Sequence, residues 1–174
     1  MELKDAISKR RSIRIYKENK VDEGIIKDAI RYGIMAPSAH NRQPWVVKIV
    51  NDQEKNAIAE ALYKKTKDIP GHTGPHTADI IKAVPNLVVV FIDNDIKENR
   101  DHDILSIGAF VENIILYLTD QEIGSLWIAN TDNIKEEIKE ILKTDLECVS
   151  CIGIGYRNQE PNARPRKSME EIMI

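Results

Sequence analysis

Hydrophobic residues recur along the chain with two spacings, one typical of helices and the other of strands. Apolar positions three or four residues apart predict about five helices and one further helical turn, at 3–7, 22–34, 57–62, 104–118, 134–142 and 169–172. Runs rich in β-branched residues predict four strands, at 45–50, 87–92, 125–129 and 149–156. The run 87–92 is apolar throughout, which indicates a strand that is covered on both faces.

Two stretches lack such periodicity, for different reasons. Residues 65–85 contain glycine and proline together at 70–71 and 74–75, so this stretch is expected to be a loop. Residues 157–174 carry two prolines and no apolar period before the last turn, which predicts an extended C-terminal arm. No internal repeat or low-complexity linker divides the sequence. These patterns together predict one α+β domain over residues 1–174, with about four core strands flanked by helices.

Composition and charge narrow the classes of function. The 174 residues carry a formal net charge of -3, so there is no overall basic field to attract nucleic acid. No stretch approaches the roughly 20 apolar residues of a membrane helix, and the charged start MELKDAISKRR lacks the apolar core of a signal peptide. Two cysteines provide no disulfide framework. We therefore expect a cytoplasmic protein that binds neither nucleic acid nor membrane.

Two short basic clusters, one near each end of the chain, contain the groups that bind phosphate. They consist of Arg10, Arg11, Ser12 and Arg14, and of Arg164 and Arg166. Arginine forks and hydroxyls give bidentate, charge-assisted hydrogen bonds to doubly charged oxygens. Alternate residues of an extended backbone share a face, so Arg10, Ser12 and Arg14 would point the same way. Taken alone, each cluster is also compatible with a solvated charged segment.

The segment 37–45 interrupts the helical period and leads into the first predicted strand. Pro37 and Pro44 restrict the backbone on either side of several short polar side chains. Such a loop can present Ser38, Asn41 and Gln43 to a planar polar ligand. The alternative is a plain connection between a helix and a strand.

Other motifs have competing interpretations. Cys148 and Cys151 have the spacing of a redox motif, but they fall at the start of a predicted strand, which favours core thiols over reactive ones. The glycines within 153–155 lack the third glycine and the following helix of a dinucleotide-binding fingerprint, so that site is rejected. Trp45 and Trp127 are expected in the core or at an interface.

The histidines do not indicate a metal site. His72 and His76 are four residues apart, but the glycine and proline between them forbid a helical pair. His102 lies between Asp101 and Asp103, and nothing in that spacing requires a metal ion. We therefore expect no metal.

Four motifs occur in an order that resembles the FMN-dependent nitroreductase family. They are RRSIR, APSAHNRQPW, IGSLWI and GIGYRNQEPNARPRKSMEEI, and they extend from about Lys4 to Ile172. The resemblance implies a nitroreductase-like fold with a mostly antiparallel central sheet, and a homodimer with two FMN molecules at the subunit interface. It also implies ping-pong transfer of electrons from NADH or NADPH through flavin N5 to a small-molecule acceptor. No side chain then needs to act as a catalytic acid or base.

By position, the resemblance assigns FMN contacts to three parts of the chain. Phosphate and ribityl contacts fall on Arg10, Arg11, Ser12, Arg14, Arg164 and Arg166. Contacts with the isoalloxazine of the neighbouring subunit fall on Pro37, Ser38 and Ala39, with Asn41 and Gln43 nearby. Backbone donors near N5 and the pyrimidine edge fall on Ile128, Ala129 and Asn130. His40 lies in the same polar loop and would shape the substrate pocket.

The chain departs from longer family members in ways that bear on the substrate. Ala129 and Asn130 stand where many of them carry Glu-Gly, residues 65–85 match no family contact, and the stretch after Phe91 is short. We expect an NAD(P)H-dependent FMN oxidoreductase that reduces nitroaromatics, quinones or a related small electrophile. The alternatives are a flavin-binding carrier or sensor without reductase turnover, and a flavin enzyme of dehalogenation or flavin cleavage.

Overall fold

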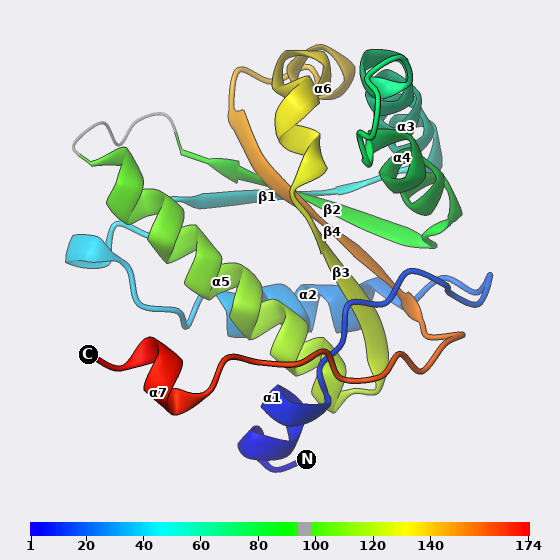
Figure 1. Ribbon diagram of the computed structural model, residues 1–174. Helices are drawn as coiled ribbons and strands as arrows, with labels where there is room; N and C mark the ends of the chain where they lie inside the picture. The colour runs from blue at the N-terminus through cyan, green and yellow to red at the C-terminus, as the bar shows by residue number, and fades with distance from the viewer. Residues whose placement is uncertain (94–98) are drawn as a thin grey trace.

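Four antiparallel strands form the sheet around which the helices pack (Figure 1). The computed structural model describes residues 1–93 and 99–174. The strands lie in the order β1-β2-β4-β3, and their bounds are β1 (Trp45–Val50), β2 (Asn86–Ile92), β3 (Ile123–Ile128) and β4 (Glu147–Tyr156). Every pairing between neighbours is antiparallel. The predicted antiparallel sheet is confirmed, and β3 forms one of its edges.

Helices cover both faces of this sheet. In the described part of the chain they are α1 (Leu3–Lys9), α2 (Glu23–Gly33), α3 (Asp52–Thr66), α4 (Gly74–Ala83), α5 (Arg100–Asp120), α6 (Lys135–Leu142) and α7 (Met169–Ile172), with 3-10 turns η1 (Ala39–Asn41) and η2 (Asn130–Ile134). Helices α3, α4 and α6 pack on one face, and α2 and α5 pack on the other (Figure 1). A hydrophobic core lies on each face of the sheet, and the side chains of β2 point alternately into the two cores. Every residue of β2 except Asn86 is buried. The prediction of a strand covered on both faces is therefore confirmed.

The prediction of a loop over 65–85 is wrong, because α4 occupies much of that stretch. Glycine and proline usually interrupt helices, but Pro75 lies in the first turn of α4, where its missing N–H is not needed. Gly74 is required by packing, since a Cβ there would lie 2.2 Å from Thr66 Oγ1 of α3. Further along α4, Ala78 and Ile81 are buried in the core against the sheet.

A bulge in β4 places both cysteines on the same face of the sheet. The register between β2 and β4 shifts so that Val149 is the extra residue of β4. Cys148 and Cys151 are consequently buried together in the core on the side of α3, α4 and α6, and both are free thiols. The prediction of core thiols is confirmed.

Helix α5 is the longest helix and supports the opposite face of the sheet. Phe110 is fully buried and stacks on Trp45 with ring centroids 5.0 Å apart, so Trp45 packs against the core as predicted. Gly33 brings α2 close to α5, since a Cβ there would lie 2.8 Å from Phe110 Cε2. Trp127 is 41% exposed, and its place at an interface stays a prediction. Neither α5 nor any other helix within the described ranges is long and apolar enough to cross a membrane.

Candidate functional site

Residues 10–16 cross the open edge of β3 as an extended arm, which we call the N-terminal arm. Ser12 forms an isolated parallel bridge with Ser125, and the Ile13 N–H donates to the Ser125 carbonyl at 2.9 Å. Gly124 permits this approach, because a Cβ there would lie 3.0 Å from Ile13 Cγ2. Ile13 is buried, and Arg14 is exposed. The predicted extended conformation is confirmed, and it places Arg14 on the side opposite Ile13.

Tyr16 fixes the far end of the N-terminal arm. Its hydroxyl donates to the Ile13 carbonyl, and its ring packs beside Gly155, where a Cβ would lie 2.7 Å from Tyr16 Cδ1. Burial raises the pKa of the Tyr16 hydroxyl well above its ordinary value, and the Arg14 cation opposes this to a smaller extent. The hydroxyl therefore stays protonated and keeps its hydrogen bond at physiological pH.

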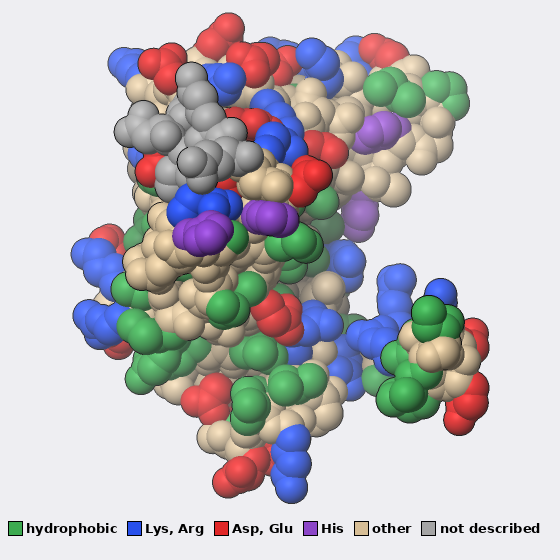
Figure 2. All heavy atoms as spheres, turned by 90° about the vertical axis from the view of Figure 1, so that its left-hand side faces the viewer, with side chains coloured by type: hydrophobic (Ala, Val, Ile, Leu, Met, Phe, Trp, Pro, Cys, Tyr) green, Lys and Arg blue, Asp and Glu red, His purple; other side chains and the backbone are tan. Residues whose placement is uncertain are grey.

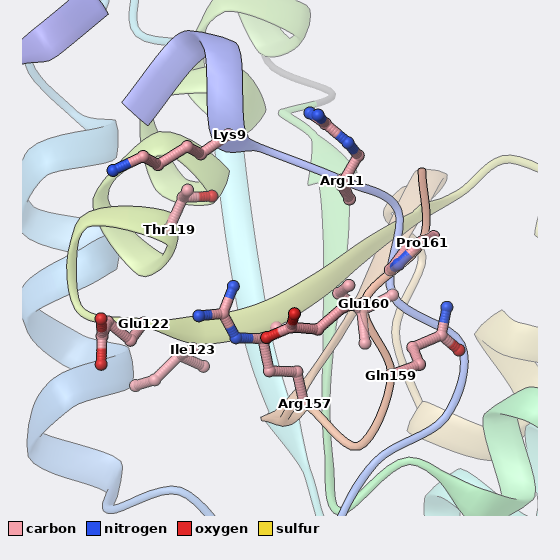
Figure 3. Close-up of a pocket in the computed structure, with 11 residues that line it drawn as sticks. Lys9, Arg11, Thr119, Glu122, Ile123, Arg157, Gln159, Glu160 and Pro161 are labelled. Carbon is pink, nitrogen blue, oxygen red and sulfur yellow. The ribbon is translucent and has the colours of Figure 1, made fainter. Parts of the chain in front are cut away.

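Alternation along the N-terminal arm turns Arg11 away from Arg14. Arg11 Nη1 donates to the carbonyl of Ser8 at 2.7 Å and to that of Arg10 at 2.8 Å, where α1 ends. Arg11 and Arg157 line a hollow of about 200 Å³ (Figure 3), and its described lining includes none of the residues 128–130. The side chain of Arg11 thus caps a helix here, and its role as a phosphate contact stays a prediction.

A different hollow, of about 300 Å³, lies on the Arg14 side of the arm, and we call it the β3–α4 cavity. Its lining residues come from the arm, β3, η2 and α4: Arg14, Thr73, His76, Thr77, Ile80, Leu126, Trp127, Ile128, Ala129 and Asn130. Four residues that the sequence assigned to the ligand, Arg14 and 128–130, therefore meet around one cavity. Strand β3 ends at Ile128, one residue before the predicted end of the strand at Ala129. Ala129 instead leads the chain into η2.

The other lining residues were not assigned to the ligand from the sequence, and three of them, Thr73, His76 and Thr77, are polar. Asn130 connects α4 to η2, because its Nδ2 donates to Thr73 Oγ1 at 2.9 Å and to Thr77 Oγ1 at 2.8 Å. A signal exists in the sequence, since residues four apart lie on one face of a helix. The spacing of Thr73 and Thr77 predicts a shared face only when the segment after Pro75 is recognised as helical.

The polar loop 37–43 is folded on itself by its own side chains. Ser38 Oγ accepts from the Gln43 N–H at 3.0 Å, and the Ser38 carbonyl accepts from the Asn41 N–H at 2.9 Å. His40, Asn41 and Gln43 have φ values between 52° and 54°. This left-handed region costs free energy for residues other than glycine, so the surrounding structure must hold the loop in place.

A buried ion pair attaches the polar loop to the first turn of α5. Arg42 Nε and Nη2 donate to Asp103 Oδ1 at 3.0 and 2.7 Å, and the Asp103 side chain is 1% exposed. From the sequence, Asp103 was weighed only as a neighbour of His102 in a candidate metal site. In the structure its carboxylate accepts hydrogen bonds from Arg42. In the ranges that the structure describes, no three His, Cys, Asp or Glu side chains gather as metal ligands would.

The polar loop and the start of the chain are attached to opposite ends of α5. The loop is held at Asp103, whereas the N-terminal amine of Met1 forms an ion pair with Asp120 at 2.6 Å. At 1.5 Å per residue, the helix separates these two aspartates by about 25 Å. The described lining of the β3–α4 cavity includes no residue of 37–43. A single chain thus brings 128–130 together with Arg14 but not with the polar loop.

The C-terminal arm begins beside the N-terminal arm and then leaves the body of the molecule. The Asn158 N–H donates to the Ile15 carbonyl at 2.9 Å, which pairs the two arms. Figure 2 shows the rest of the arm standing apart from the body. Arg164 and Arg166 are exposed on this arm, and neither lines the β3–α4 cavity within the described residues. Of the two predicted phosphate clusters, only Arg14 is therefore found in the described lining of this cavity.

Known proteins are similar in sequence to this chain over most of its length. The model described as "Nitroreductase family" matches residues 7–156. The Bacillus subtilis (strain 168) protein YfhC, by its name a candidate NAD(P)H nitroreductase, is 25% identical over 177 residues, covering 97% of this chain and 91% of that protein. An Archaeoglobus fulgidus protein, named as a candidate NADH dehydrogenase/NAD(P)H nitroreductase, is 26% identical over 155 residues, covering 87% and 83%.

Solved structures share the fold. A candidate nitroreductase from Desulfovibrio desulfuricans, in complex with FMN, has a TM-score of 0.87 and 22% identity, covering 100% of this chain and 96% of that one. A mutant of NfnB, an FMN and NADPH-dependent nitroreductase from Sphigopyxis sp. strain HMH, has a TM-score of 0.83 and 16% identity, covering 100% and 98%. The predicted nitroreductase-like fold is confirmed. With its arms, sheet and cavity arranged in this way, and with the family model matched over most of its length, the chain belongs to the nitroreductase family.

Proposed function

We propose that this chain is an FMN-dependent oxidoreductase that takes electrons from NADH or NADPH and passes them to a small electrophile, such as a nitroaromatic or a quinone. The observation that carries the proposal is the β3–α4 cavity, where Arg14 meets residues 128–130. Membership of the nitroreductase family supports it, as do the relatives named for NAD(P)H nitroreductase activity.

The groups around the N-terminal arm suit both ends of an FMN molecule. Arg10, Ser12 and Arg14 alternate along the extended arm, so they can share the side that would hold a phosphate and a polyol. Within the described chain neither Arg10 nor Arg14 forms an ion pair, which leaves both charges available. Ile80 and Leu126 add apolar wall to the cavity, as a planar ring requires.

The protein's contribution would be to bind, orient and stabilise charge. Bound FMN would supply the redox chemistry, the transfer of hydride from the nicotinamide to the acceptor. Arg14 would hold a cation at the ring edge where negative charge develops on reduction. The backbone N–H of Ala129, at the turn into η2, would donate toward N5. No side chain in this scheme has to move a proton.

We infer that two chains complete each site. The polar loop, Arg164 and Arg166 are absent from the described lining of the β3–α4 cavity of their own chain, so a second chain would supply them. Apolar side chains are exposed where such a chain could pack, including Leu3 and Met35 at a hollow of about 400 Å³. Met169 and Ile172 of α7 are exposed as well. Exposed apolar surface of this extent favours association with another protein surface.

Purification tests the proposal directly. We expect a yellow protein with flavin absorbance, and oxidation of NADH or NADPH that a quinone or nitroaromatic accelerates. A colourless protein that gains no FMN on reconstitution would contradict the proposal. Rapid mixing with NADH and NADPH then distinguishes an enzyme from a flavin carrier, since a carrier would reduce its bound flavin slowly or not at all.

Charge reversal tests the phosphate contacts. Arg10→Glu and Arg166→Glu are each expected to abolish retention of FMN while the chain stays folded. Lys64→Glu is the matched control, because Lys64 is exposed on α3 and pairs only with its helix neighbour Glu60 among the described residues. Normal FMN occupancy in either arginine variant would remove that residue from the site.

A further inference from the structure

The side chain of Asn130 faces α4 with both of its donors in use. Its Nδ2 donates to Thr73 Oγ1 at 2.9 Å and to Thr77 Oγ1 at 2.8 Å. A carboxamide has two N–H donors and one carbonyl acceptor. With both donors engaged, Oδ1 is the polar atom of Asn130 that remains, and no described residue donates to it. Asn130 therefore offers an acceptor to whatever occupies the β3–α4 cavity.

The two threonines differ in what they leave free. Thr77 Oγ1 donates its proton to the Thr73 carbonyl at 3.1 Å and accepts from Asn130, so it has no proton left to donate to a ligand. Thr73 Oγ1 accepts from Asn130, and among the described groups its own proton has no acceptor. Thr73 is also exposed and lines the cavity. It therefore offers a donor.

Arg14 offers further donors from the N-terminal arm. Its Nη1 donates to the Ser12 carbonyl at 3.2 Å, and its Nε and Nη2 have no partner in the described chain. Beside the exposed imidazole of His76 and the backbone of Ala129, the side chains of the cavity thus offer a ligand an acceptor on Asn130 and donors on Thr73 and Arg14. They come from three separate elements, held in place by the hydrogen bonds between η2 and α4.

We propose that this set recognises the imide edge of the flavin ring, C2=O, N3–H and C4=O, with Asn130 Oδ1 accepting from N3–H. The edge presents one donor between two acceptors, which is the complement of the groups on Thr73, Asn130 and Arg14. Thr73 and Arg14 donate to the two carbonyl oxygens. The inference rests on the proposed function, and it gives the side chain of Asn130 a task that a glycine could not perform.

Binding of a flavin that lacks the N3 proton tests the inference. The full-length chain, stripped of flavin, is titrated with FMN and with 3-methyl-FMN, and both dissociation constants are measured by fluorescence. We expect 3-methyl-FMN to bind about tenfold more weakly, as befits the loss of one hydrogen bond in a partly enclosed site. Asn130→Ala should bind the two flavins equally, because it has no acceptor to lose.

Three further variants separate the hydrogen bond from other effects. Asn130→Asp keeps acceptor oxygens and should still prefer FMN, which also covers the case in which Asn130→Ala does not fold. Thr73→Val should weaken both flavins and keep the preference. Asn133→Ala is the matched control, because among the described residues Asn133 Nδ2 donates only to the backbone carbonyl of Asn130, at 2.9 Å, and to its neighbour Asp132. It should behave like the wild type.

Two results would overturn the inference, and they differ from failure of the proposed function. Equal binding of FMN and 3-methyl-FMN by the wild type would show that the protein accepts no hydrogen bond from N3–H, although an FMN site exists. A preference for FMN that persists in Asn130→Ala would show that the methyl group is excluded by shape alone. Failure of the wild type to bind FMN at all would remove the proposed function itself, and the inference with it.

Discussion

Among individual polar residues, Arg42 and Asp103 carry a large expected effect on stability, because their ion pair is buried. Removing one partner of a buried ion pair leaves an uncompensated charge, at a cost of about 3 kcal/mol or more. We expect Asp103→Ala to lower the free energy of unfolding by about 3 kcal/mol, measured by urea denaturation. Glu60→Ala, which breaks the exposed pair with Lys64, should leave the free energy of unfolding almost unchanged.

A compensating variant shows whether the charge or the packing matters at this pair. Arg42→Met combined with Asp103→Leu removes both charges and keeps apolar volume, so it should recover most of the lost stability. The polar loop would remain attached to α5 only through apolar contact. A double variant as unstable as Asp103→Ala would mean that the hydrogen bonds of Arg42, rather than its isolated charge, hold the loop.

The two cysteines are expected to be chemically inert in the folded protein. The hydrogen bond with Cys148 and burial raise the pKa of the Cys151 thiol, so it stays protonated. A thiol reagent at pH 8 should therefore label neither Cys148 nor Cys151 until urea unfolds the chain. Rapid labelling of the native protein would contradict the buried position of the pair.

Single residues also show which parts of the site a sequence can reveal. Arg14 could be placed from alternation along an extended segment, which is a local property. The same alternation, applied strictly, turns Arg11 to the other side, where it caps α1. The bonds of Asn130 could not be foreseen, because Thr73 and Thr77 lie more than fifty residues away in the sequence.

At the scale of elements, α4 depends on close approach to α3. We expect Gly74→Ala to destabilise the protein by about 1 to 3 kcal/mol, since the new Cβ would lie 2.2 Å from Thr66 Oγ1 and 2.6 Å from Thr66 Cβ. Thermal or urea unfolding measures the loss. Adding Thr66→Ala should recover part of it by removing the clash, whereas Thr66→Ala alone should only destabilise.

The same helix explains an error of sequence reasoning. Glycine followed by proline usually marks a loop, but the same pair can also begin a helix, because proline lacks only the N–H that a first turn does not use. What distinguishes the two cases is the packing of Gly74 on Thr66, a tertiary contact. Strands were easier than α4 to predict from the sequence, because the runs 87–92 and 149–156 are apolar enough to identify buried strands without knowledge of their partners.

Glu147 links the starts of three elements and makes stability depend on pH. Hydrogen bonds from Arg100 of α5 and Lys135 of α6, at 2.6 and 2.7 Å, hold the pKa of Glu147 below its ordinary 4.5. A lowered pKa in the folded state adds stability above pH 4.5, and this is lost as the pH falls through the lowered value. We expect Glu147→Gln to cost below about 1 kcal/mol at pH 7, because the side chains are partly exposed.

Unfolding at two pH values checks this assignment. The difference in stability between the wild type and Glu147→Gln should be present at pH 7 and should shrink at pH 3, because below pH 4.5 the carboxyl of Glu147 is protonated more readily in the unfolded chain than in the folded one. A difference that is the same at both pH values would mean that packing of the side chain, and not its charge, supports the junction of α5, α6 and β4.

At the scale of the whole molecule, the polar loop 37–43 and the N-terminal arm must belong to different copies if both are to touch one flavin. The order of motifs along the sequence predicted both segments but could not say how far apart they would lie. The polar loop is held at Asp103 and the first residue of the chain at Asp120, and these two aspartates lie about 25 Å apart along α5. The exposed Met169 and Ile172 of the C-terminal arm indicate a further surface that a second copy would cover.

Complementation between two defective chains tests this arrangement. Arg10→Glu removes the phosphate contact of one half-site, and Ala39→Trp fills the space that the polar loop would leave for the ring. Each variant alone should bind no FMN. When the two are unfolded, mixed in equal amounts and refolded, half of the dimers pair one of each, and one of their two sites combines two unaltered halves, so about a quarter of all sites should bind FMN. If both segments served a flavin within the same chain, every site in the mixture would carry one defect and the mixture would stay colourless, which makes the appearance of flavin absorbance on mixing the decisive sign of a shared site.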